Sequence, residues 1–395
     1  SSIMRAAVVT GNLNIMAGGA KFSLVVIKLL KDLNYSVDVF TSERTNRQKI
    51  WNWRQFDFGA YVDREIVVFP YHPLPTIYSS YINWLFRDLI TVPSLKKRYD
   101  LTITTLEIMP MVFTDIIYVH SVDMWTRHPY NINFKKYEDN KFLTAYSRPY
   151  WLLAQYMVKA FRFLDYKPVI VTNSNYTKSM IEKYLNIKPI LIYPHVDVER
   201  YLPLGNKLNR TDTVLTISRF HEGKLLENVI EVAKQVKSKA RFVIFGSVHG
   251  RGEQKYANKL YETAREMGVD NKISLIVNAP DSEKRQWLSQ AKILLHPTRG
   301  EHFGVAVVEG MAAGLIPIVH RSGGAWTDII NYGRYGFGFQ DIQEAASTID
   351  NILSSTNLYE EFKNIVTKRS LYFSEERFRQ NFISLVNLFR LVNNR

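Results

Sequence analysis

Two glutamates lie eight positions apart in the stretch GEHFGVAVVEGMAAGLIPIVHRSGG, which runs from residue 300 to 324. Glu301 and Glu309 are set among apolar residues and glycines, where an ionised carboxylate needs hydrogen-bond partners. A carboxylate such as Glu309 can accept two hydrogen bonds from the diol of a ribose, and Glu301 can do the same for hydroxyls of a hexose. The alternative is that these glutamates bind no ligand. One would then be a carboxylate at the start of a helix, and the other a neighbour hydrated by solvent.

The segment that carries these glutamates has the pattern of a strand, a loop and a helix. KILLHP predicts the strand and VAVVEGMAAG the helix, with Gly304 near the helix start. Backbone N–H groups at a helix start lack internal partners, and the helix dipole favours an anion there. We therefore expect this backbone to hold a phosphate-linked sugar between the two carboxylates.

Two cationic residues follow the end of another predicted strand. Arg219 and Lys224 lie five positions apart in ISRFHEGK, directly after TVLTIS. A guanidinium can form paired hydrogen bonds with phosphate oxygens, and a lysine supplies a mobile point charge. The pattern favours contact with phosphate. The alternative is an ordinary basic loop, because the whole chain is basic.

Three further loops follow predicted strands and carry candidate residues. Gly18 and Gly19 in MAGGAKF lie between the first strand and its helix, where glycine lets the backbone approach a ligand. Ser322 and Gly323 in HRSGGAWTD precede a helix, either as an anion-binding helix start or as a tight turn. His120 ends IIYVH, where it could polarise a hydroxyl or be a partly buried histidine with its hydrogen bonds satisfied.

Strands and helices alternate along both halves of the chain, which is typical of doubly wound parallel sheets. The pattern begins at RAAVVT and restarts after the polar stretch LPLGNKLNRTD, residues 202–212, which we expect to be a linker. The sequence therefore predicts two α/β Rossmann-like domains, over residues 1–197 and 198–373. Ligands of such sheets bind beyond the carboxyl ends of the strands, so two domains facing each other would form a cleft.

Composition narrows the class of protein. The chain has 395 residues and a formal net charge of +14, which attracts phosphate as nucleic acid, nucleotide or anionic membrane. It contains no cysteine, so disulfides and thiolate metal sites are excluded. No Asp-x-Asp sequence occurs, and we expect no metal site. The N-terminal SSIMRAAVVT is not expected to be a signal peptide, and we expect no transmembrane helix.

The spacing E-x7-E in EHFGVAVVE, followed by MAAG and SGG, resembles the retaining glycosyltransferases of family four. Within that family the likeness is greatest to α-1,2-mannosyltransferases that act on dolichol-linked oligosaccharide. It is strong over residues 300–330 and weaker over 213–224 and the N-terminal loop. The resemblance implies the GT-B architecture, in which a terminal helix, here about residues 374–395, returns to the first domain.

The resemblance also implies roles for single residues. His120, Arg219, Lys224 and Glu301 would be catalytic, with the two cations gripping the diphosphate of the donor. The implied donor-binding residues are Gly18, Gly19, Asn278, Phe303, Gly304, Val305, Glu309, Ser322 and Gly323. The donor would be GDP-mannose first and a UDP-sugar next. No metal and no further cofactor would be needed.

The acceptor is expected to be a glycan linked to a lipid. Two stretches, residues 77–98 and 147–167, mix aromatic side chains with Lys and Arg, which suits a bilayer interface. We expect peripheral docking on an anionic membrane at its cytoplasmic face. The alternative is that both stretches are helices packed on the first domain's sheet.

Two other functions remain open from the sequence. A sugar-nucleotide epimerase or hydrolase could use the same two-domain scaffold without any acceptor. A basic nucleic-acid-binding protein would fit the charge, but it needs a concentrated basic stripe with stacking aromatics. Lys and Arg are instead interleaved with acidic residues along the chain. No nucleic-acid partner is therefore expected.

Overall fold

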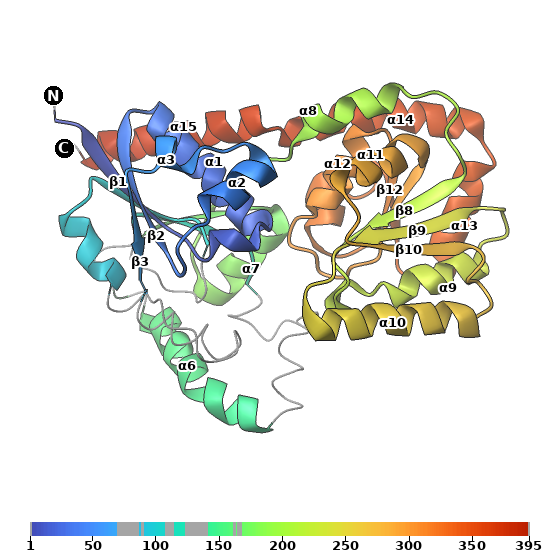
Figure 1. Ribbon diagram of the computed structural model, residues 1–395, viewed down its shortest axis with the longest axis horizontal. Coiled ribbons are helices and arrows are strands. Elements are labelled where there is room, and N and C mark those ends of the chain that lie inside the picture. The colour runs from blue at the N-terminus through green and yellow to red at the C-terminus, as the bar shows by residue number, and fades with distance from the viewer. Residues whose placement is uncertain are drawn as a thin grey trace. The chain divides into compact units, whose positions relative to one another are not determined.

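The structure is a computed structural model that describes residues 2–68, 87, 91–106, 114–122, 141–160, 163 and 168–393. The chain divides into two compact units, drawn in Figure 1. Unit 1 comprises Ser1–Asn173, Thr177–Ile192 and Asn381–Arg395, and unit 2 comprises Ser174–Tyr176 and Tyr193–Gln380. The division after Ile192 lies a few residues before the boundary expected at residue 197.

Unit 1 is built on a parallel sheet of seven strands in the order β3-β2-β1-β4-β5-β6-β7. Its central strands are short apolar runs, as expected for strands covered on both faces. The strands are β1 Met4–Val9, β2 Tyr35–Thr41, β3 Arg64–Val67, β4 Leu101–Thr104, β5 Ile116–Val119, β6 Val169–Thr172 and β7 Ile190–Leu191.

The helices of unit 1 connect these parallel strands. The first of them buries nine of its residues, because its apolar positions repeat with helical period. The helices are α1 Gly18–Asp32, α2 Arg47–Arg54, α3 Phe58–Tyr61, α6 Lys141–Ala160 and α7 Asn175–Leu185, with 3-10 turns at Leu13–Ile15 and Val92–Lys97.

Unit 2 repeats the plan with six parallel strands in the order β10-β9-β8-β11-β12-β13. Almost every residue of β8, β9, β11 and β12 is buried. The strands are β8 Thr213–Ile217, β9 Arg241–Gly246, β10 Ile273–Val277, β11 Ile293–His296, β12 Ile316–His320 and β13 Phe337–Phe339. The predicted pair of Rossmann-like parallel-sheet domains is confirmed.

The helices of unit 2 cover both faces of its sheet, and two hydrophobic clusters fill the space between. The helices are α8 Val198–Tyr201, α9 Glu227–Gln235, α10 Gly250–Glu266, α11 Asp281–Gln290, α12 Val305–Ala312, α13 Ile342–Leu353 and α14 Thr356–Ser370. The last helix, α15 Glu375–Asn393, begins in unit 2 and ends in unit 1.

The strand order reverses once in each sheet, between β1 and β4 and between β8 and β11. At such a switch point the loops that leave neighbouring strands diverge, and ligands bind beside them at the carboxyl ends. The loops after β8 and β11 hold Lys224 and Glu301, so the topology of unit 2 brings these two loops to one edge.

The polar stretch over residues 202–212 belongs to unit 2 and does not join the two units, so the prediction that it is a linker is wrong. It opens with a 3-10 helix at Leu202–Asn206. The Arg210 guanidinium donates hydrogen bonds to the backbone carbonyls of Leu204, Leu288, Ala291 and Ala313. Most of the stretch is exposed, as its polar composition predicts, but these hydrogen bonds of Arg210 hold it against unit 2.

The two aromatic, basic stretches differ in how far the structure describes them. Most of residues 77–98 lies outside the described part of the chain. Within 147–167, α6 is described as far as Ala160. In the described ranges no helix combines the length and apolar character needed to cross a bilayer.

Candidate active site

The loop between β11 and α12 positions the first glutamate. Strand β11 is fully buried and ends at His296, after which the chain turns through Gly300, whose φ is +63°. Gly304 caps α12 with a φ of +113°, a conformation that L side chains rarely adopt. Glu301 therefore lies in a loop between two glycine turns, as the sequence predicts, and Glu309 lies on the helix.

Glu301 has two basic partners. Its Oε2 is 3.4 Å from Nζ of Lys224 and 3.1 Å from Nε2 of His296, and its side chain is only 20% exposed. Burial opposes ionisation, but the Lys224 ammonium and the hydrogen bond from His296 outweigh it. The pKa of Glu301 is therefore well below its ordinary value. The site holds a fixed negative charge beside a mobile positive one.

Lys224 and Arg219 leave the end of β8 in different directions. Lys224 ends a 3-10 turn, and its ammonium reaches Glu301. The guanidinium of Arg219 lies 3.5 Å from a carboxylate oxygen of Glu253 on α10, and the side chain is about half exposed. The structure thus joins Lys224 to the glutamate loop, whereas Arg219 is paired with a residue that the sequence did not indicate.

Glu309 is paired with a lysine from another helix. Nζ of Lys284 on α11 lies 2.6 Å from Oε2 of Glu309 and 3.3 Å from the hydroxyl of Tyr201. Burial disfavours the charged lysine, but Glu309 more than offsets this, so the pKa of Lys284 is raised. Sequence reasoning missed Lys284, and no signal marks it, because nothing in DSEKRQWLSQ distinguishes it from an exposed lysine.

The segment Ser322–Gly324 packs against the glutamate loop. The Ser322 hydroxyl accepts a hydrogen bond from the N–H of Gly300 and lies 2.7 Å from Nδ1 of His320. A Cβ on Gly323 would lie 2.3 Å from the carbonyl oxygen of Glu301, and Gly323 has a φ of +76°. These residues therefore fix the position of the Glu301 loop. Their predicted contact with an anion stays a prediction.

The remaining donor-binding candidates of unit 2 differ in exposure. Phe303 is 4% exposed and its ring stacks on that of Tyr193, so its side chain belongs to the core. Val305 is 38% exposed at the first position of α12. The side-chain amide of Asn278 pairs with the backbone N–H and C=O of Val248, which ties the end of β10 to the loop after β9.

Unit 1 holds the candidates near its own switch point. Gly18 is the first residue of α1, and a Cβ added there would have no atom within 4 Å. A Cβ on Gly19 would lie 2.8 Å from the side chain of Leu106. Nε2 of His120 lies 2.7 Å from the carbonyl oxygen of Thr105. Burial lowers the pKa of His120 to about 4, so the ring is neutral at physiological pH. Because a carbonyl oxygen can only accept, Nε2 carries the ring proton in this contact.

No group of three or more His, Asp or Glu side chains close enough to share a metal ion occurs in the part of the chain that the structure describes. The catalytic and donor-binding assignments stay predictions. The structure divides the assigned residues between the two units. Lys224, Glu301, Ser322 and Gly323 form one connected cluster in unit 2. His120, Gly18 and Gly19 belong to unit 1.

A family model matches the part of the chain that holds this cluster. Residues 203–369 match the model described as glycosyl transferases group 1. The matched range lies within unit 2 and includes Lys224, Lys284, Glu301 and Glu309. The matched range begins inside the stretch 202–212, consistent with its packing in unit 2.

The curated relatives that the chain matches below have the same name. The chain is 30% identical over 238 residues to the Xenopus laevis GDP-Man:Man(3)GlcNAc(2)-PP-Dol alpha-1,2-mannosyltransferase, a match that covers 55% of this chain and 48% of that protein. The Dictyostelium discoideum protein of the same name is 27% identical over 226 residues, covering 54% and 45%. The chain thus spans about half the length of the curated relatives it matches.

Solved structures resemble the whole chain. A glycosyltransferase from Rickettsia africae superposes with a TM-score of 0.68 at 18% identity and covers 98% of this chain and 99% of its own. HepE from Anabaena, solved in complex with UDP and glucose, gives 0.68 at 16% identity, covering 97% and 99%. The structural neighbours are GT-B glycosyltransferases, and the chain shares their fold.

Proposed function

We propose that this chain is a retaining glycosyltransferase that moves a hexose, mannose first among the candidates, from a nucleotide sugar to a lipid-linked glycan. The observation that carries the proposal is the contact of Lys224 with Glu301, at the switch point of a glycosyltransferase group 1 domain. The names of the relatives suggest GDP-mannose as the donor and a glycan on a dolichol diphosphate as the acceptor. Unit 2 would bind the donor and unit 1 the acceptor.

In the proposed reaction the bond between the anomeric carbon and the donor's phosphate oxygen breaks. The acceptor hydroxyl oxygen bonds to the same face of that carbon, and its proton passes to the departing phosphate. Lys224, helped by Arg219, would neutralise the charge that develops on the diphosphate. Because these cations serve the leaving group, we propose that no divalent metal is required.

The carboxylates would orient the sugars. Glu301 is held ionised, so its oxygens can only accept hydrogen bonds, which suits the hydroxyls of a hexose. Glu309 would accept from the ribose diol of the nucleotide. His120 would act from unit 1 as an uncharged polar group, because burial lowers the pKa of its ring.

A binding and transfer assay tests the proposal. Stabilisation against heat is measured with GDP, UDP, GDP-mannose and UDP-glucose, followed by transfer to a lipid-linked glycan in the presence of EDTA. We expect one nucleotide series to stabilise the protein and Glu309→Ala to weaken that effect. Turnover without an acceptor would favour an epimerase or hydrolase, and binding of RNA instead of any nucleotide sugar would refute the proposal.

Docking on the cytoplasmic face of a membrane is the second part of the proposal. Helix α6 exposes Phe142, Leu152 and Tyr156, at 69%, 57% and 70%, together with Lys141, Arg148 and Lys159. Among the helix residues with described side chains, only Ser147 is buried. Apolar side chains beside cations suit the interface of an anionic bilayer.

Flotation with vesicles that contain anionic lipid tests this docking. Leu152→Ser/Tyr156→Ser should reduce the bound fraction several-fold. The control Leu208→Ser/Tyr332→Ser changes the same residue types at exposed positions of unit 2. Equal loss in both variants, or no binding of the unaltered chain at low salt, would count against the membrane role.

A further inference from the structure

A cationic pocket opens on one face of the unit 1 sheet. Its volume is about 590 Å³, and its walls come from β1, β2 and β3 on one side and residues 91–99 on the other. Arg5 lies four residues before the end of β1, about 13 Å from the carboxyl edge at 3.3 Å per residue, whereas Phe40 and Ile66 lie one residue before the ends of β2 and β3. None of the lining residues belongs to the loops that carry Gly18 and His120.

The strand register gathers charged side chains on this face. Asp38 on β2 pairs with Ala7 on β1 and with Arg64 on β3. Residues paired in this way point to the same side of a sheet, and so do residues two apart on one strand. Asp38, Arg64 and Arg5 therefore share one face, although they are far apart in the sequence.

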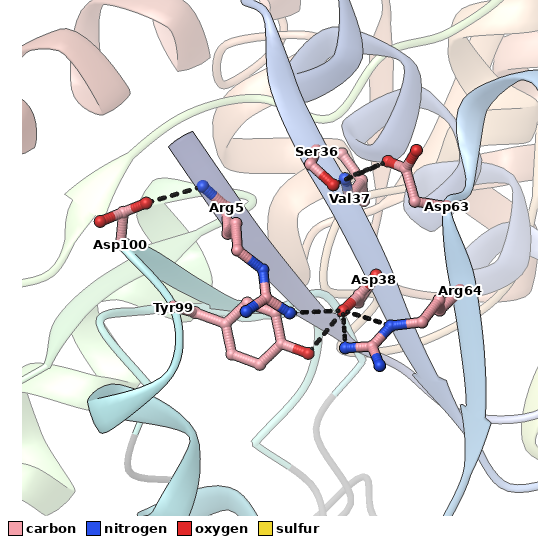
Figure 2. Close-up of polar contacts among 8 residues, drawn as sticks. All are labelled: Arg5, Ser36, Val37, Asp38, Asp63, Arg64, Tyr99 and Asp100. Carbon is pink, nitrogen blue, oxygen red and sulfur yellow. Dashed lines mark hydrogen bonds and ion pairs between the residues drawn. The ribbon is translucent and has the colours of Figure 1, made fainter. Parts of the chain in front are cut away.

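The side chains of Arg5, Arg64 and Tyr99 converge on the Asp38 carboxylate (Figure 2). Its Oδ2 accepts hydrogen bonds from the Tyr99 hydroxyl at 2.7 Å, Nη2 of Arg64 at 2.8 Å and Nη2 of Arg5 at 3.3 Å. The Asp38 side chain is 4% exposed, whereas those of Arg5 and Arg64 are 45% and 62% exposed. A buried carboxylate thus orients two guanidiniums that remain accessible.

Each guanidinium keeps N–H donors that do not bond to Asp38. Arg5 bonds to Asp38 through Nη2 and Arg64 through Nε and Nη2. Among the residues that the structure describes, Nη1 of neither arginine forms a hydrogen bond. A guanidinium has five N–H donors, so each arginine can still bind an anion in a forked geometry.

The pocket carries a strong positive charge. Lys97 and Arg98 also line it, and both are exposed, with no side-chain ion pair to any other residue that the structure describes. Four cationic side chains and the one carboxylate of Asp38 leave a net charge of +3. Asp63 and Asp100 do not line the pocket, and their carboxylates accept hydrogen bonds from the backbone N–H groups of Val37 and Arg5.

The rest of the lining is partly apolar. Phe40, Ile66 and Leu95 supply apolar surface, while Thr91 and Ser94 supply hydroxyls. Guanidiniums and hydroxyls together match the oxygens of a phosphate, and the apolar wall can take the group esterified to it. A dianionic phosphate suits a net charge of +3 better than a single carboxylate does.

We propose that this pocket binds the phosphate of a phosphate ester or diphosphate. The same chemistry is found in the headgroup of an anionic lipid and in a soluble phosphorylated compound. The inference does not depend on glycosyl transfer, since none of the pocket residues belongs to the site in unit 2.

Binding of inorganic pyrophosphate to the full chain tests the pocket. The measurement uses the Arg219→Gln/Lys224→Gln background, so that the two cations assigned to the donor site in unit 2 do not contribute. Lys97→Gln/Arg98→Gln should weaken binding roughly tenfold, because two unpaired charges are lost. Lys49→Gln/Lys188→Gln, which removes two exposed charges elsewhere on unit 1, should change it less than about twofold.

Binding to vesicles distinguishes a lipid headgroup from a soluble phosphorylated compound. If phosphatidylcholine vesicles with phosphatidic acid bind through Lys97 and Arg98 and pyrophosphate competes, the ligand is a lipid phosphate. If pyrophosphate binding alone depends on these residues, the ligand is soluble. Absence of saturable pyrophosphate binding, or an equal loss in the control, overturns the proposal. A failure of nucleotide-sugar binding would leave it untouched.

Discussion

The ammonium nitrogen of Lys284 lies 2.6 Å from a carboxylate oxygen of Glu309, and their side chains are only 18% and 12% exposed. The second glutamate of the E-x7-E spacing therefore has a charged internal partner before any ligand arrives. The Tyr201 hydroxyl lies 3.3 Å from the same ammonium. A ribose diol would meet a carboxylate whose orientation is already fixed, which reduces the cost of ordering it on binding.

Breaking this pair should destabilise the protein. Lys284→Met leaves a buried carboxylate without its partner, and we expect the free energy of unfolding to fall by about 3 kcal/mol. Lys284→Met/Glu309→Leu should cost less than the sum of the two single changes. Denaturant unfolding measures all three variants.

The matched control for that cycle is Lys292→Met. Lys292 lies 2.7 Å from Asp212, whose side chain is 48% exposed. A pair that reaches water contributes little, so we expect a loss of about 1 kcal/mol or less. Equal losses at Lys284 and Lys292 would show that burial of the Lys284–Glu309 pair has no energetic consequence.

Replacing Lys224 should chiefly slow the chemical step. The ammonium lies 3.4 Å from Glu301, where we place the donor's diphosphate and sugar. Loss of one charge that stabilises a leaving group typically lowers kcat about 100-fold. Steady-state kinetics of Lys224→Ala with GDP-mannose measure this, with Lys234→Ala on the exposed side of α9 as the control. A normal kcat in Lys224→Ala would refute the role assigned to this residue.

Gly323→Ala should displace the Glu301 loop. The new Cβ would lie 2.3 Å from a backbone oxygen, and the φ of +76° is unfavourable for alanine. We expect at least about 2 kcal/mol of lost stability, together with weaker nucleotide-sugar binding. The melting temperature and a binding titration report the two effects.

Gly252→Ala is the comparison for that change. Gly252 lies in α10 with open space around its Cβ position. Alanine favours the helix, so stability should be unchanged or rise by up to about 1 kcal/mol. If the two alanine variants behave alike, the close backbone contact of Gly323 does not hold the loop.

The charge state of His120 makes stability depend on pH. Burial lowers its pKa to about 4 from an ordinary value of 6.5, so the proton binds the unfolded chain more readily. This contribution to stability is complete above about pH 6.5 and is lost as the pH falls toward 4. NMR titration of the ring checks the value, and a midpoint near 6.5 would contradict it.

The inner strands of both sheets could be predicted because each leaves a local pattern. Strands buried on both faces are short apolar runs, and helices between them repeat with a period near 3.6. The edge strands β3, β7 and β13 are short and only partly buried, and the sequence pattern does not predict them. The polar composition of 202–212 likewise gives no sign of the hydrogen bonds by which Arg210 holds the stretch against unit 2. Local pattern reports average exposure and not the partner of a single side chain.

The candidate site was predicted in part. Placing Lys224 and Glu301 in loops after strands was enough to bring them to one edge, because the carboxyl ends of adjacent parallel strands meet there. The pairs of Lys284 with Glu309 and of Arg219 with Glu253 carry no sequence signal. They depend on which helices lie side by side.

The sequence by itself determined the alternation of strands and helices and the loops that carry Lys224 and Glu301. It did so because backbone periodicity and glycine turns are local properties of the chain. Only the tertiary structure decided that Asp38 anchors Arg5 and Arg64, or that Lys284 holds Glu309. Such pairs join residues from separate elements, and strand order and helix packing alone bring them within hydrogen-bonding distance.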